Sequence, residues 1–596
     1  MAVTQSNDSP TKNYAVMSPL HPNTGTFSKG NLTAVTDGTD GAQPVGSIAF
    51  NSEDSAGYYF IMRPTTTSSS IGAFAVGVAT VAHANERPTN DATNAGSWFF
   101  NCGNGNVTNT SAIANGTWDS GGNGGMSLNQ YVQVAVKAGK IYFGVNNTWY
   151  DSSDGTFANA GHAFDNLTGF VVPMFQHAHA SAGTVEVQFG ETTFTYAAPT
   201  GYKEITAANL YSSAAPAIED GSAHFQTILW SGNSSSQTAT QTGNSGFTPD
   251  WAIIKSRSFG NGANSFDSVR GGSKGLATFD SGVEDDQADG VVFSSSGGKG
   301  TLAFTGSGDT GDINHTGRTY LAWTWLAGGA PTTDNISNGG SPGQTPTNNS
   351  VFRDGAASTT AFGSATIYPT RASINTTCGL SIIEYVGTGS NATLAHGLGA
   401  VPKMAWFRNR ESAGNNWVVY HSSATGNTHH TNLDATTAKA AGDRFQDTDP
   451  TNEVFSVDGT TDINKSTDEH VAYIFAEVPG FSRFGFFEGN GSSANGPFIE
   501  LGFKPAWFMW KNVDSSTNGN WTVMDSGRDP FNMVENNLRM DTADAQDTGE
   551  ADLDFLSNGV RHRGGTSERF NTDNQTYLYA AFAEHPFAGS TPATAR

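Results

Sequence analysis

The sequence is short of cysteine and of long apolar stretches, and each shortage excludes a class of protein. Its 596 residues include two cysteines, Cys102 and Cys378, which lie far apart with no second cysteine or metal-spaced histidine nearby. A disulfide framework and a zinc site are therefore not expected. No stretch approaches the roughly 18 consecutive apolar residues of a spanning helix. The N-terminus has no basic segment followed by an apolar one, so we expect no signal peptide.

Positive charge is scarce as well. The chain has 30 lysines and arginines against 54 acidic residues, a net charge of −24, and no basic run forms a local exception. Such a field repels phosphate backbones, so nucleic acid is not expected as a partner. The acidity has two interpretations: solubility in a concentrated or salty medium, which is the simpler, and attraction to a cationic target.

What the chain does contain is glycine and aromatic residues. It has 71 glycines, and 11% of its residues are aromatic, which argues against disorder because disordered chains lack such side chains. Short aromatic and β-branched runs separated by turn residues predict many short strands. A chain of this length is too long for one core. The expected fold class is all-β, a string of antiparallel β-sandwich domains.

A hairpin pattern stands out in residues 131–150. Val132, Val134 and Val136 alternate before an Ala138-Gly139 turn, and a second alternating run, Ile141, Phe143 and Val145, follows it. This register gives both arms one apolar face, as in a sandwich strand pair.

A second pattern repeats three times after residue 203. Each copy has a proline-containing opening strand, a middle strand and an aromatic closing strand, and the opening prolines are Pro249, Pro402 and Pro505. Proline suits the first residue of a strand, where no ladder hydrogen bond is needed. The best helical candidate is the short segment 435–446. The expected organisation is an extended lead-in that could attach to a virion (1–45), a β-sandwich (46–205), repeat 1 (206–328), a linker or loop-rich segment (329–377), repeat 2 (378–479) and repeat 3 (480–596).

Several motifs of the sandwich carry a family likeness. The runs IGAFAVGVA (71–79), KIYFGVNNTWYDSSDGTFANA (140–160), NLTGFVVPMF (166–175) and VEVQFG (185–190) lead to FTYAAPTGYKE (194–204). This series resembles a SPRY (B30.2-like) domain. The lead-in NDSPTKNYAVMSPLHPN (7–23) is similar to one that precedes such domains in tail proteins of marine and other environmental bacteriophages. The repeats, through GFTPDWAIIKSR (246–257), FDSVRGG (266–272) and TYLAWTWLAGG (319–329), resemble a domain of unknown function that often follows there.

The resemblance implies a virion protein without catalysis, a tail fibre or receptor-binding appendage for host attachment. It implies virion proteins and a host-surface glycan or protein as partners, a homotrimer, no cofactor, no membrane insertion, and synthesis in the host cytoplasm without a signal peptide. A head fibre or decoration protein is the first alternative. A polysaccharide depolymerase is the second, although the chain has no Gly-x-Ser-x-Gly or HExxH motif, and paired carboxylates are uninformative among so many acidic residues.

Possible metal sites are weak. His177 and His179 share one face of a strand but have no third ligand at a sensible spacing, and His429 and His430 face opposite ways if extended. Acidic runs could bind calcium, yet none has the spacing of a twelve-residue calcium loop, and solvated loops are the simpler interpretation. These runs are 282–290, 447–453 and 541–554.

Tryptophans are the remaining candidates for ligand contact. Five of them recur in the repeats, which favours a role in the core over stacking on sugars: Trp251, Trp406, Trp417, Trp507 and Trp521. Trp118 and Trp149 do not recur and lie in Gly/Asn-rich segments. They are the two candidate ligand-binding residues.

Overall fold

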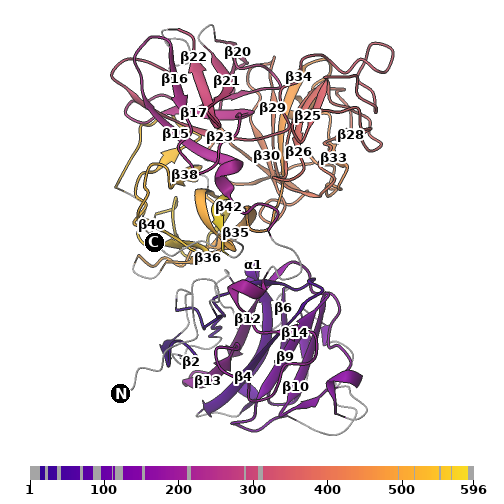
Figure 1. Ribbon diagram of the computed structural model, residues 1–596, viewed down its shortest axis with the longest axis vertical. Helices are drawn as coiled ribbons and strands as arrows, with labels where there is room; N and C mark the ends of the chain where they lie inside the picture. Colours follow the sequence, from indigo (N-terminus) through magenta and orange to yellow (C-terminus); the bar gives the residue numbers. More distant parts are fainter. Residues whose placement is uncertain are drawn as a thin grey trace. The chain divides into compact units, whose positions relative to one another are not determined.

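The computed structural model confirms an all-β protein (Figure 1). Its helical segments are one turn or so long: α1 (Val81–Ala84), α2 (Thr461–Asn464), η1 (Ile71–Ala73), η2 (Phe157–Asn159), η3 (Ala207–Asn209) and η4 (Gly221–Ala223). In the part of the chain that the structure describes, no helix is long and apolar enough to cross a membrane. The described residues are 14–19, 25–36, 42–67, 71–84, 96–105, 107–109, 112–113, 125–150, 155–210, 216–287, 290–306, 313–493, 496–515, 517–549, 552–565 and 567–587.

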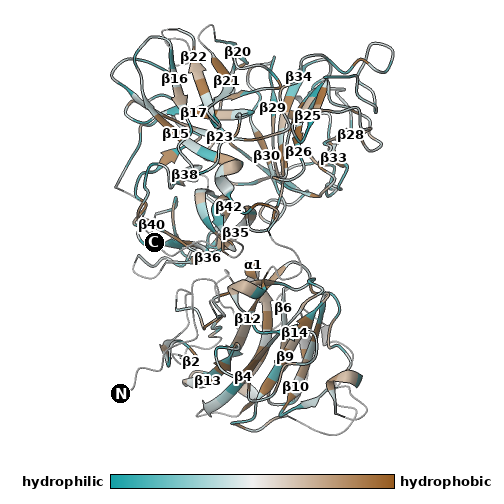
Figure 2. Ribbon diagram, viewed as in Figure 1, coloured by the Kyte–Doolittle hydropathy of each residue, from teal (hydrophilic) through white to brown (hydrophobic). Residues whose placement is uncertain are grey.

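The chain forms two compact units. The first comprises residues 1–216 with 495–502, which includes β36 (Phe498–Glu500), and 587–594. The second comprises residues 217–494, 503–586 and 595–596. In both, brown hydrophobic and teal hydrophilic residues occur together on the strands (Figure 2).

The first unit is a sandwich of two sheets. The larger has the order β1-β2-β13-β4-β9-β10-β11, with β14 added parallel to β4. Its strands are β1 (Thr26–Ser28), β2 (Thr33–Val35), β13 (Gly183–Gln188), β4 (Gly57–Thr67), β9 (Val132–Lys137), β10 (Lys140–Val145), β11 (Thr148–Trp149) and β14 (Tyr202–Lys203). The smaller has the order β3 (Phe50–Asn51), β12 (Phe170–His177), β5 (Phe74–Thr80), β6 (Ser97–Asn101), β7 (Val107–Asn109) and β8 (Ala112–Ile113).

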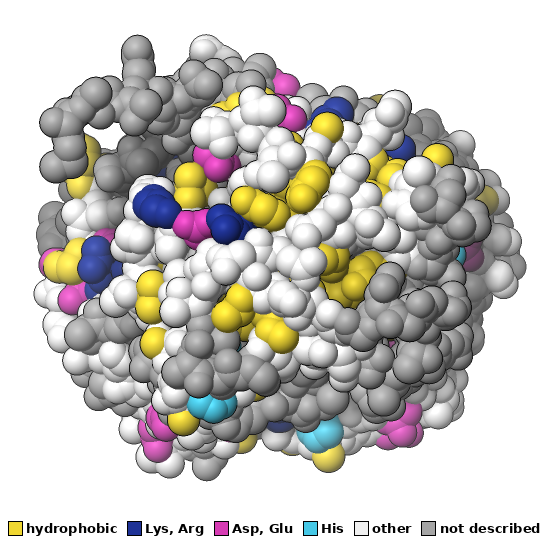
Figure 3. All heavy atoms as spheres, turned by 90° about the horizontal axis from the view of Figure 1, so that it is seen from below, with side chains coloured by type: hydrophobic (Ala, Val, Ile, Leu, Met, Phe, Trp, Pro, Cys, Tyr) yellow, Lys and Arg dark blue, Asp and Glu magenta, His cyan; other side chains and the backbone are white. Residues whose placement is uncertain are grey.

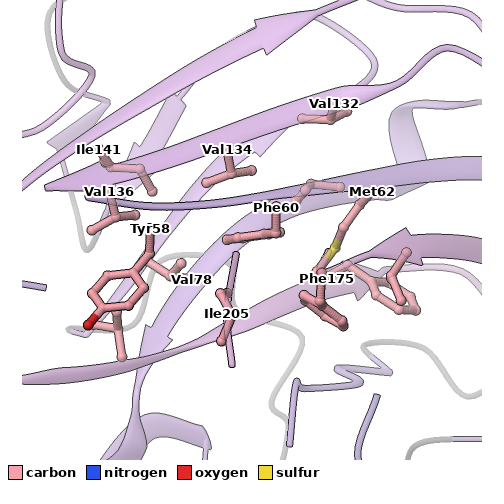
Figure 4. Packing of buried hydrophobic residues seen from close by; sticks show 14 of the residues in the cluster. Tyr58, Phe60, Met62, Val78, Val132, Val134, Val136, Ile141, Phe175 and Ile205 are labelled. Atoms are coloured by element: carbon pink, nitrogen blue, oxygen red, sulfur yellow. The ribbon is translucent and has the colours of Figure 1, made fainter. Parts of the chain in front are cut away.

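Strand alternation places one core between these sheets. Tyr58, Phe60 and Met62 of β4 point into it, and Val78 and Phe175 meet them from the smaller sheet (Figure 4). The predicted hairpin is confirmed, because Lys137 of β9 pairs with Lys140 of β10 around the turn. Ala138 and Gly139 both have positive φ, 50° and 74°, as a two-residue hairpin turn of type I′ requires.

The expected lead-in is in part a component of this sandwich. β1 and β2 come from residues 26–35, and β2 pairs with β13 along the edge of the larger sheet. An extended segment was expected here, but Ala34 of β2 is fully buried in the core. The expected boundary at residue 45 therefore divides a continuous fold.

The second unit contains the three repeats, each built on the same main sheet. The closing strand lies in the centre, with the opening strand on one side. The first sheet has the order β15 (Phe225–Ser231), β23 (Thr319–Trp325), β17 (Trp251–Ser256), β18 (Asn264–Asp267), β19 (Lys274–Ala277) and β20 (Asp285–Asp286). The third has the order β35 (Ser482–Glu488), β42 (Thr576–Pro586), β37 (Phe503–Asn512), β38 (Thr522–Asp525) and β39 (Leu538–Arg539).

The main sheet of the second repeat is longer. Its common part is β27 (Leu380–Val386), β34 (Glu469–Ala476), β29 (Pro402–Asn409) and β30 (Val418–His421), continued by β31 (His429–Asn432) and β32 (Ala440–Ala441). On the other edge it is extended by β26 (Arg371–Asn375), β24 (Val351–Arg353) and β25 (Ala356–Ala357). Residues 329–377 are thus not the expected linker, because they supply these three strands. Residues 435–446 hold β32 and turns in place of the expected helix.

Small sheets pack against the main sheets. The first repeat uses β16 (Gln237–Thr240), β22 (Lys299–Phe304) and β21 (Val291–Ser296); the second pairs β28 (Ala392–Ala395) with β33 (Val454–Val457); the third pairs β40 (Leu553–Leu556) with β41 (Gly559–His562). Apolar residues of the main and small sheets share one core in the first and second repeats.

The three opening prolines occupy slightly different places. Pro402 is the first residue of β29, as expected, whereas Pro249 lies just before β17. Pro505 lies inside β37, where the register with β42 shifts on both sides of it. Proline has no N–H to donate to a regular ladder, and it is tolerated at this position because the ladder is already irregular there.

The repeats close into a ring within the second unit. A buried cation stands six residues after each opening proline: Lys255, Arg408 and Lys511. Each donates to a backbone carbonyl of its own repeat and to one of a neighbour. The neighbouring acceptors are Thr542 O for Lys255 (2.7 Å), Gly282 O for Arg408 and Ala435 O for Lys511 (2.9 Å). Repeat 1 therefore binds repeat 3, repeat 2 binds repeat 1, and repeat 3 binds repeat 2.

Candidate functional site

The outer face of the larger sandwich sheet carries a cluster of aromatic residues. Tyr59 and Trp149 are buried within it, and half-buried rings surround them. Trp149 is 4% exposed, with the Phe157 ring edge-on at 4.7 Å between centroids. The half-buried members are Tyr131, Tyr142, Phe157, Phe194, Tyr196 and Tyr202. Burial raises the pKa of Tyr59 and of Tyr202 well above the usual range.

Beside this cluster the same face holds a pocket of about 200 Å³. Strand alternation builds it: Val185 and Val187 of β13 point into the core, so Glu186 between them points outward. Arg63 of β4 and Thr33 of β2 lie on the same outer face. The lining residues are Lys29, Leu32, Thr33, Ile61, Arg63, Tyr131, Glu186, Val187, Gln188, Glu191 and Thr192.

The charged groups of this pocket hold one another in place. Glu186 accepts from Lys29 Nζ at 2.6 Å through one oxygen and pairs with Arg63 Nη1 at 3.3 Å through the other. The Arg63 guanidinium also donates to the backbone and side-chain oxygens of Asn129 and lies 5.0 Å from the centre of the Tyr131 ring. The Arg63 and Glu186 side chains are each about three-tenths exposed. The Thr33 hydroxyl is buried and has no hydrogen-bond partner among the described residues.

In the described part of the face that Figure 3 shows, charged side chains are few. Hydrophobic side chains form small separate groups there, and basic and acidic side chains lie next to one another. Mixed charge of this kind suits a partner recognised by local hydrogen bonds more than one attracted by a broad field of one sign.

The second unit has a larger cleft, of about 540 Å³, between the first repeat and residues 327–377. Phe247, Pro249 and Phe293 supply an apolar wall, and the buried Asp250 lines the cleft as well. The Asp250 carboxylate accepts from Ser268 Oγ at 3.0 Å and from Ala327 N at 2.8 Å. Burial raises the pKa of Asp250 to about 6. Because its oxygens are engaged by these donors, this carboxyl ties the repeat to the segment that follows.

The two histidine pairs lie in different surroundings. His177 is buried, its ring lies 4.4 Å from that of Phe74 between centroids, and its Nδ1 lies 3.1 Å from the Thr36 hydroxyl. The His179 ring is 6.3 Å from it. On β31, His430 is buried and His429 half-buried. Among the described residues, no group of three histidine, cysteine or acidic side chains is placed to hold a metal ion.

The first acidic run connects two repeats. Glu284 forms ion pairs with Arg270 of its own repeat at 3.0 Å and with Arg410 of the second repeat at 2.7 Å. Arg410 also bonds Glu384 and Glu469. Residues 282–290 are thus partly an interface, where we had expected a solvated loop or a calcium site.

The other acidic runs differ from one another. In the third repeat Asp541 accepts from Trp521 N and Asn520 Nδ2, and burial raises its pKa to about 6. Asp544 pairs with Arg539 at 2.7 Å. In the second repeat Asp447 and Asp449 are exposed.

The recurrent tryptophans are buried at the junction of the repeats. Trp251 pairs with Trp325, and Trp507 pairs with Phe582 at the equivalent place. Met404 occupies that place in the second repeat, so Trp406 lies two residues further along the same strand and is not equivalent to the other two. Trp417 and Trp521 are equivalent, because each indole N–H donates at 2.7 Å to a carbonyl of the preceding repeat.

Of the two predicted ligand-binding residues, Trp118 lies outside the described residues. Trp149 is covered by its aromatic neighbours and supports the outer face without offering a free ring. Sequence reasoning missed Arg63, Tyr131 and Glu186. The signal was present in GYYFIMR (57–63), where Tyr59, Ile61 and Arg63 alternate with the core residues Tyr58, Phe60 and Met62.

Comparison with protein families identifies the repeats. Residues 220–351 and 343–586, more than half of the chain, match the family described as "Domain of unknown function (DUF7483)". The chain belongs to this family. The DUF7483 matches cover all three repeats, including the strands that extend the second one.

Outside DUF7483 the comparisons are less informative. The SPRY domain of human HERC1 is similar over 29% of this chain and 92% of its own length, with 12% sequence identity and a TM-score of 0.20. Likeness at that level carries no argument about function. Among curated proteins, none matches this chain.

Proposed function

We propose that this chain is a virion protein without catalysis, a bacteriophage tail fibre or similar appendage that attaches to the host surface. The observation that carries the proposal is the open pocket on the outer face of the sandwich, which joins half-buried aromatic rings to fixed polar groups. Such a surface suits recognition of an external ligand. The likeness of several motifs to phage tail proteins supports the setting.

The second unit supports a structural part of this role. Its three repeats bury their aromatic residues against one another inside one chain, which suits a rigid element of a particle. A homotrimer remains part of the proposal. Because the ring already uses the faces at which the repeats meet, subunits would associate through outer surfaces. The other partners proposed are virion proteins and a host-surface glycan or protein.

The carboxyls with raised pKa support the absence of catalysis. Asp250, Asp434 and Asp541 belong to three different repeats, and burial is the main cause of the raised pKa in each. Asp434 and Asp541 each accept from the backbone N–H of a tryptophan, Trp417 and Trp521, at 3.3 Å. A buried carboxyl with the same packing role in two repeats is a poor candidate for a hydrolytic acid or base.

Immunogold labelling of purified particles tests the proposal. Label at the tail or its fibres is expected. Label confined to the head would support the alternative of a head fibre or decoration protein, and particles without label would contradict a virion role. The depolymerase alternative is tested separately by measuring the chain length of host polysaccharide after incubation with the protein, which we expect to leave it unchanged.

A further inference from the structure

The pocket beside Tyr131 has the size and the chemical groups to bind one six-membered ring of a ligand. Pockets for drug-sized ligands usually have about 300–1,000 Å³, and this one, at about 200 Å³, is smaller. Its polar groups are held before any ligand arrives: Asn129, Glu186 and the Tyr131 ring fix the Arg63 guanidinium. Preorganised groups of this kind bind with little loss of side-chain entropy.

The hydrogen-bonding capacity of these groups is not used up. A guanidinium has five N–H donors, and the contacts described for Arg63 use three. Each oxygen of Glu186 accepts one hydrogen bond, from Lys29 or from Arg63, and can accept another. A donor fork and a carboxylate side by side match adjacent hydroxyl groups, which both donate and accept.

The apolar wall of the pocket complements this pair. Leu32, Ile61 and Tyr131 line it, and the Tyr131 ring is edge-on to Tyr196 at 5.7 Å between centroids. A pyranose ring presents hydroxyl groups at its rim and C–H groups on its faces, so it fits a pocket with one polar and one apolar side.

Charge decides which kind of sugar fits. Lys29 and Arg63 supply two positive charges, and Glu186 and Glu191 supply two negative ones, so the pocket is close to neutral. The whole chain carries −24, which repels acidic sugars such as uronates. We propose that this pocket binds a neutral hexopyranose unit of a host-surface glycan, with Arg63 as hydrogen-bond donor and Glu186 as acceptor. This inference rests on the proposed function.

Saturation-transfer NMR with the full chain tests it, using D-glucose, D-mannose and D-galactose, with D-glucuronate as the acidic comparison. Saturation transfer to at least one neutral hexose is expected, with little to glucuronate. Arg63→Met should weaken the binding of that hexose by about tenfold, because it removes one hydrogen bond that involves a charged group. Glu186→Gln, which keeps the side-chain shape, should have a similar effect and serves if Arg63→Met does not fold.

Arg371→Met is the matched control. Arg371 lies in the second unit, pairs with Asp334 at 2.6 Å and is about as exposed as Arg63, so its loss should leave hexose binding unchanged. No saturation transfer to any of the three hexoses, or equal transfer with the Arg63 and Glu186 variants, would overturn the inference. Adsorption of the wild-type chain to host cells is measured alongside. Adsorption that persists without hexose binding removes the sugar site and leaves the proposed function standing.

Discussion

The hydroxyl group of Tyr473 in the second repeat donates a hydrogen bond of 2.6 Å to Oδ2 of Asp267 in the first. Both side chains are fully buried, and Arg270 donates to the same oxygen of Asp267 at 2.6 Å. The third repeat has the same arrangement with the first, because Trp323 donates to Oδ2 of Asp525 at 3.0 Å beside Arg528. The second and third repeats are also in contact, because Nε2 of His421 in the second repeat lies 3.1 Å from the carbonyl oxygen of Tyr579 in the third.

Replacing Tyr473 by phenylalanine should destabilise the second unit. The change keeps the ring and removes the hydrogen bond to the buried carboxylate together with those to Ser265 (3.0 Å) and Arg270 (3.1 Å). Loss of the bond to the carboxylate alone costs about 1.5–3 kcal/mol. Urea unfolding followed by tryptophan fluorescence measures the loss. Tyr142→Phe is the control, since this half-buried tyrosine lies in the first unit and should change the unfolding free energy by less than about 0.5 kcal/mol. Equal effects of the two changes would contradict the role of Tyr473.

Replacing Glu284 by glutamine should be more costly. Glu284 pairs with two arginines at a site where only about a tenth of its side chain is exposed, and removing one member of a buried pair costs about 3–5 kcal/mol. Glu186→Gln is the matched control, because Glu186 also pairs with two cations but is 31% exposed, where ion pairs contribute about 0–1 kcal/mol. Denaturant unfolding of both variants at neutral pH decides between them. A loss below about 1 kcal/mol for Glu284→Gln would show that the network is solvated.

Glu284 also predicts part of the pH dependence. Burial raises the pKa of its carboxyl, but the hydrogen bond from Arg410 and the charges of Arg270 and Arg410 outweigh burial, so the pKa is lowered. Its stabilisation is therefore present above the unfolded-state pKa of about 4.3 and is lost as pH falls through the folded-state value. Glu284→Gln should flatten the acid limb of the stability curve in that window. An acid limb identical to that of the wild type would contradict this.

The burial of His562 predicts that stability also depends on pH in a second, higher range. His562 is 1% exposed between Phe487 and Trp510, and burial lowers its pKa to about 3. Neither ring nitrogen has a hydrogen-bond partner in the part of the chain that the structure describes. Between the unfolded value of about 6.5 and about 3, the unfolded chain binds a proton that the folded chain does not, so stability falls as pH falls. His562→Phe should reduce the loss between pH 7.5 and pH 5 by about 2 kcal/mol. Denaturant unfolding at both pH values measures it, and an unchanged loss would contradict it.

Trp507 tests whether the recurrent tryptophans belong to the core. It is 1% exposed and lies within 6.3 Å of the rings of Phe225, Trp323, Trp325 and Phe582, measured between centroids. Trp507→Ala should cost about 3–5 kcal/mol. Phe531→Ala is the control, because Phe531 is 77% exposed and should cost less than about 0.5 kcal/mol. Calorimetry that finds Trp507→Ala harmless would favour a ligand-binding role for this tryptophan.

The sequence predicted those parts of the fold that depend on neighbouring residues. Alternation of Val132, Val134 and Val136 was enough for the hairpin, because strand period and turn residues are local properties. The three copies of opening and closing strands were visible for the same reason. The extra strands from residues 351–375 were missed because they are short and lie between polar loops, and the pairing of β24 with β26 fixes them.

The closed arrangement of the three repeats could not be derived from these patterns, because contacts between repeats produce no periodic pattern in the sequence. One signal was available: Lys255, Arg408 and Lys511 each interrupt an apolar strand at the same offset from its proline. A cation in a buried strand must reach oxygen acceptors, and here they belong partly to the next repeat. For the site, the sequence singled out Trp149, but the side chains left accessible around it are those of Tyr131 and its neighbours, because exposure depends on how residues 155–163 and 191–203 cover the sheet.

Adsorption to host cells tests the central claim, attachment without catalysis, most directly. Labelled full-length protein is mixed with host cells, and free protein then competes with intact particles for adsorption. We predict saturable binding, reduced particle adsorption and host polysaccharide of unchanged length. No binding by the intact assembly, or shortened polysaccharide after binding, would contradict the account.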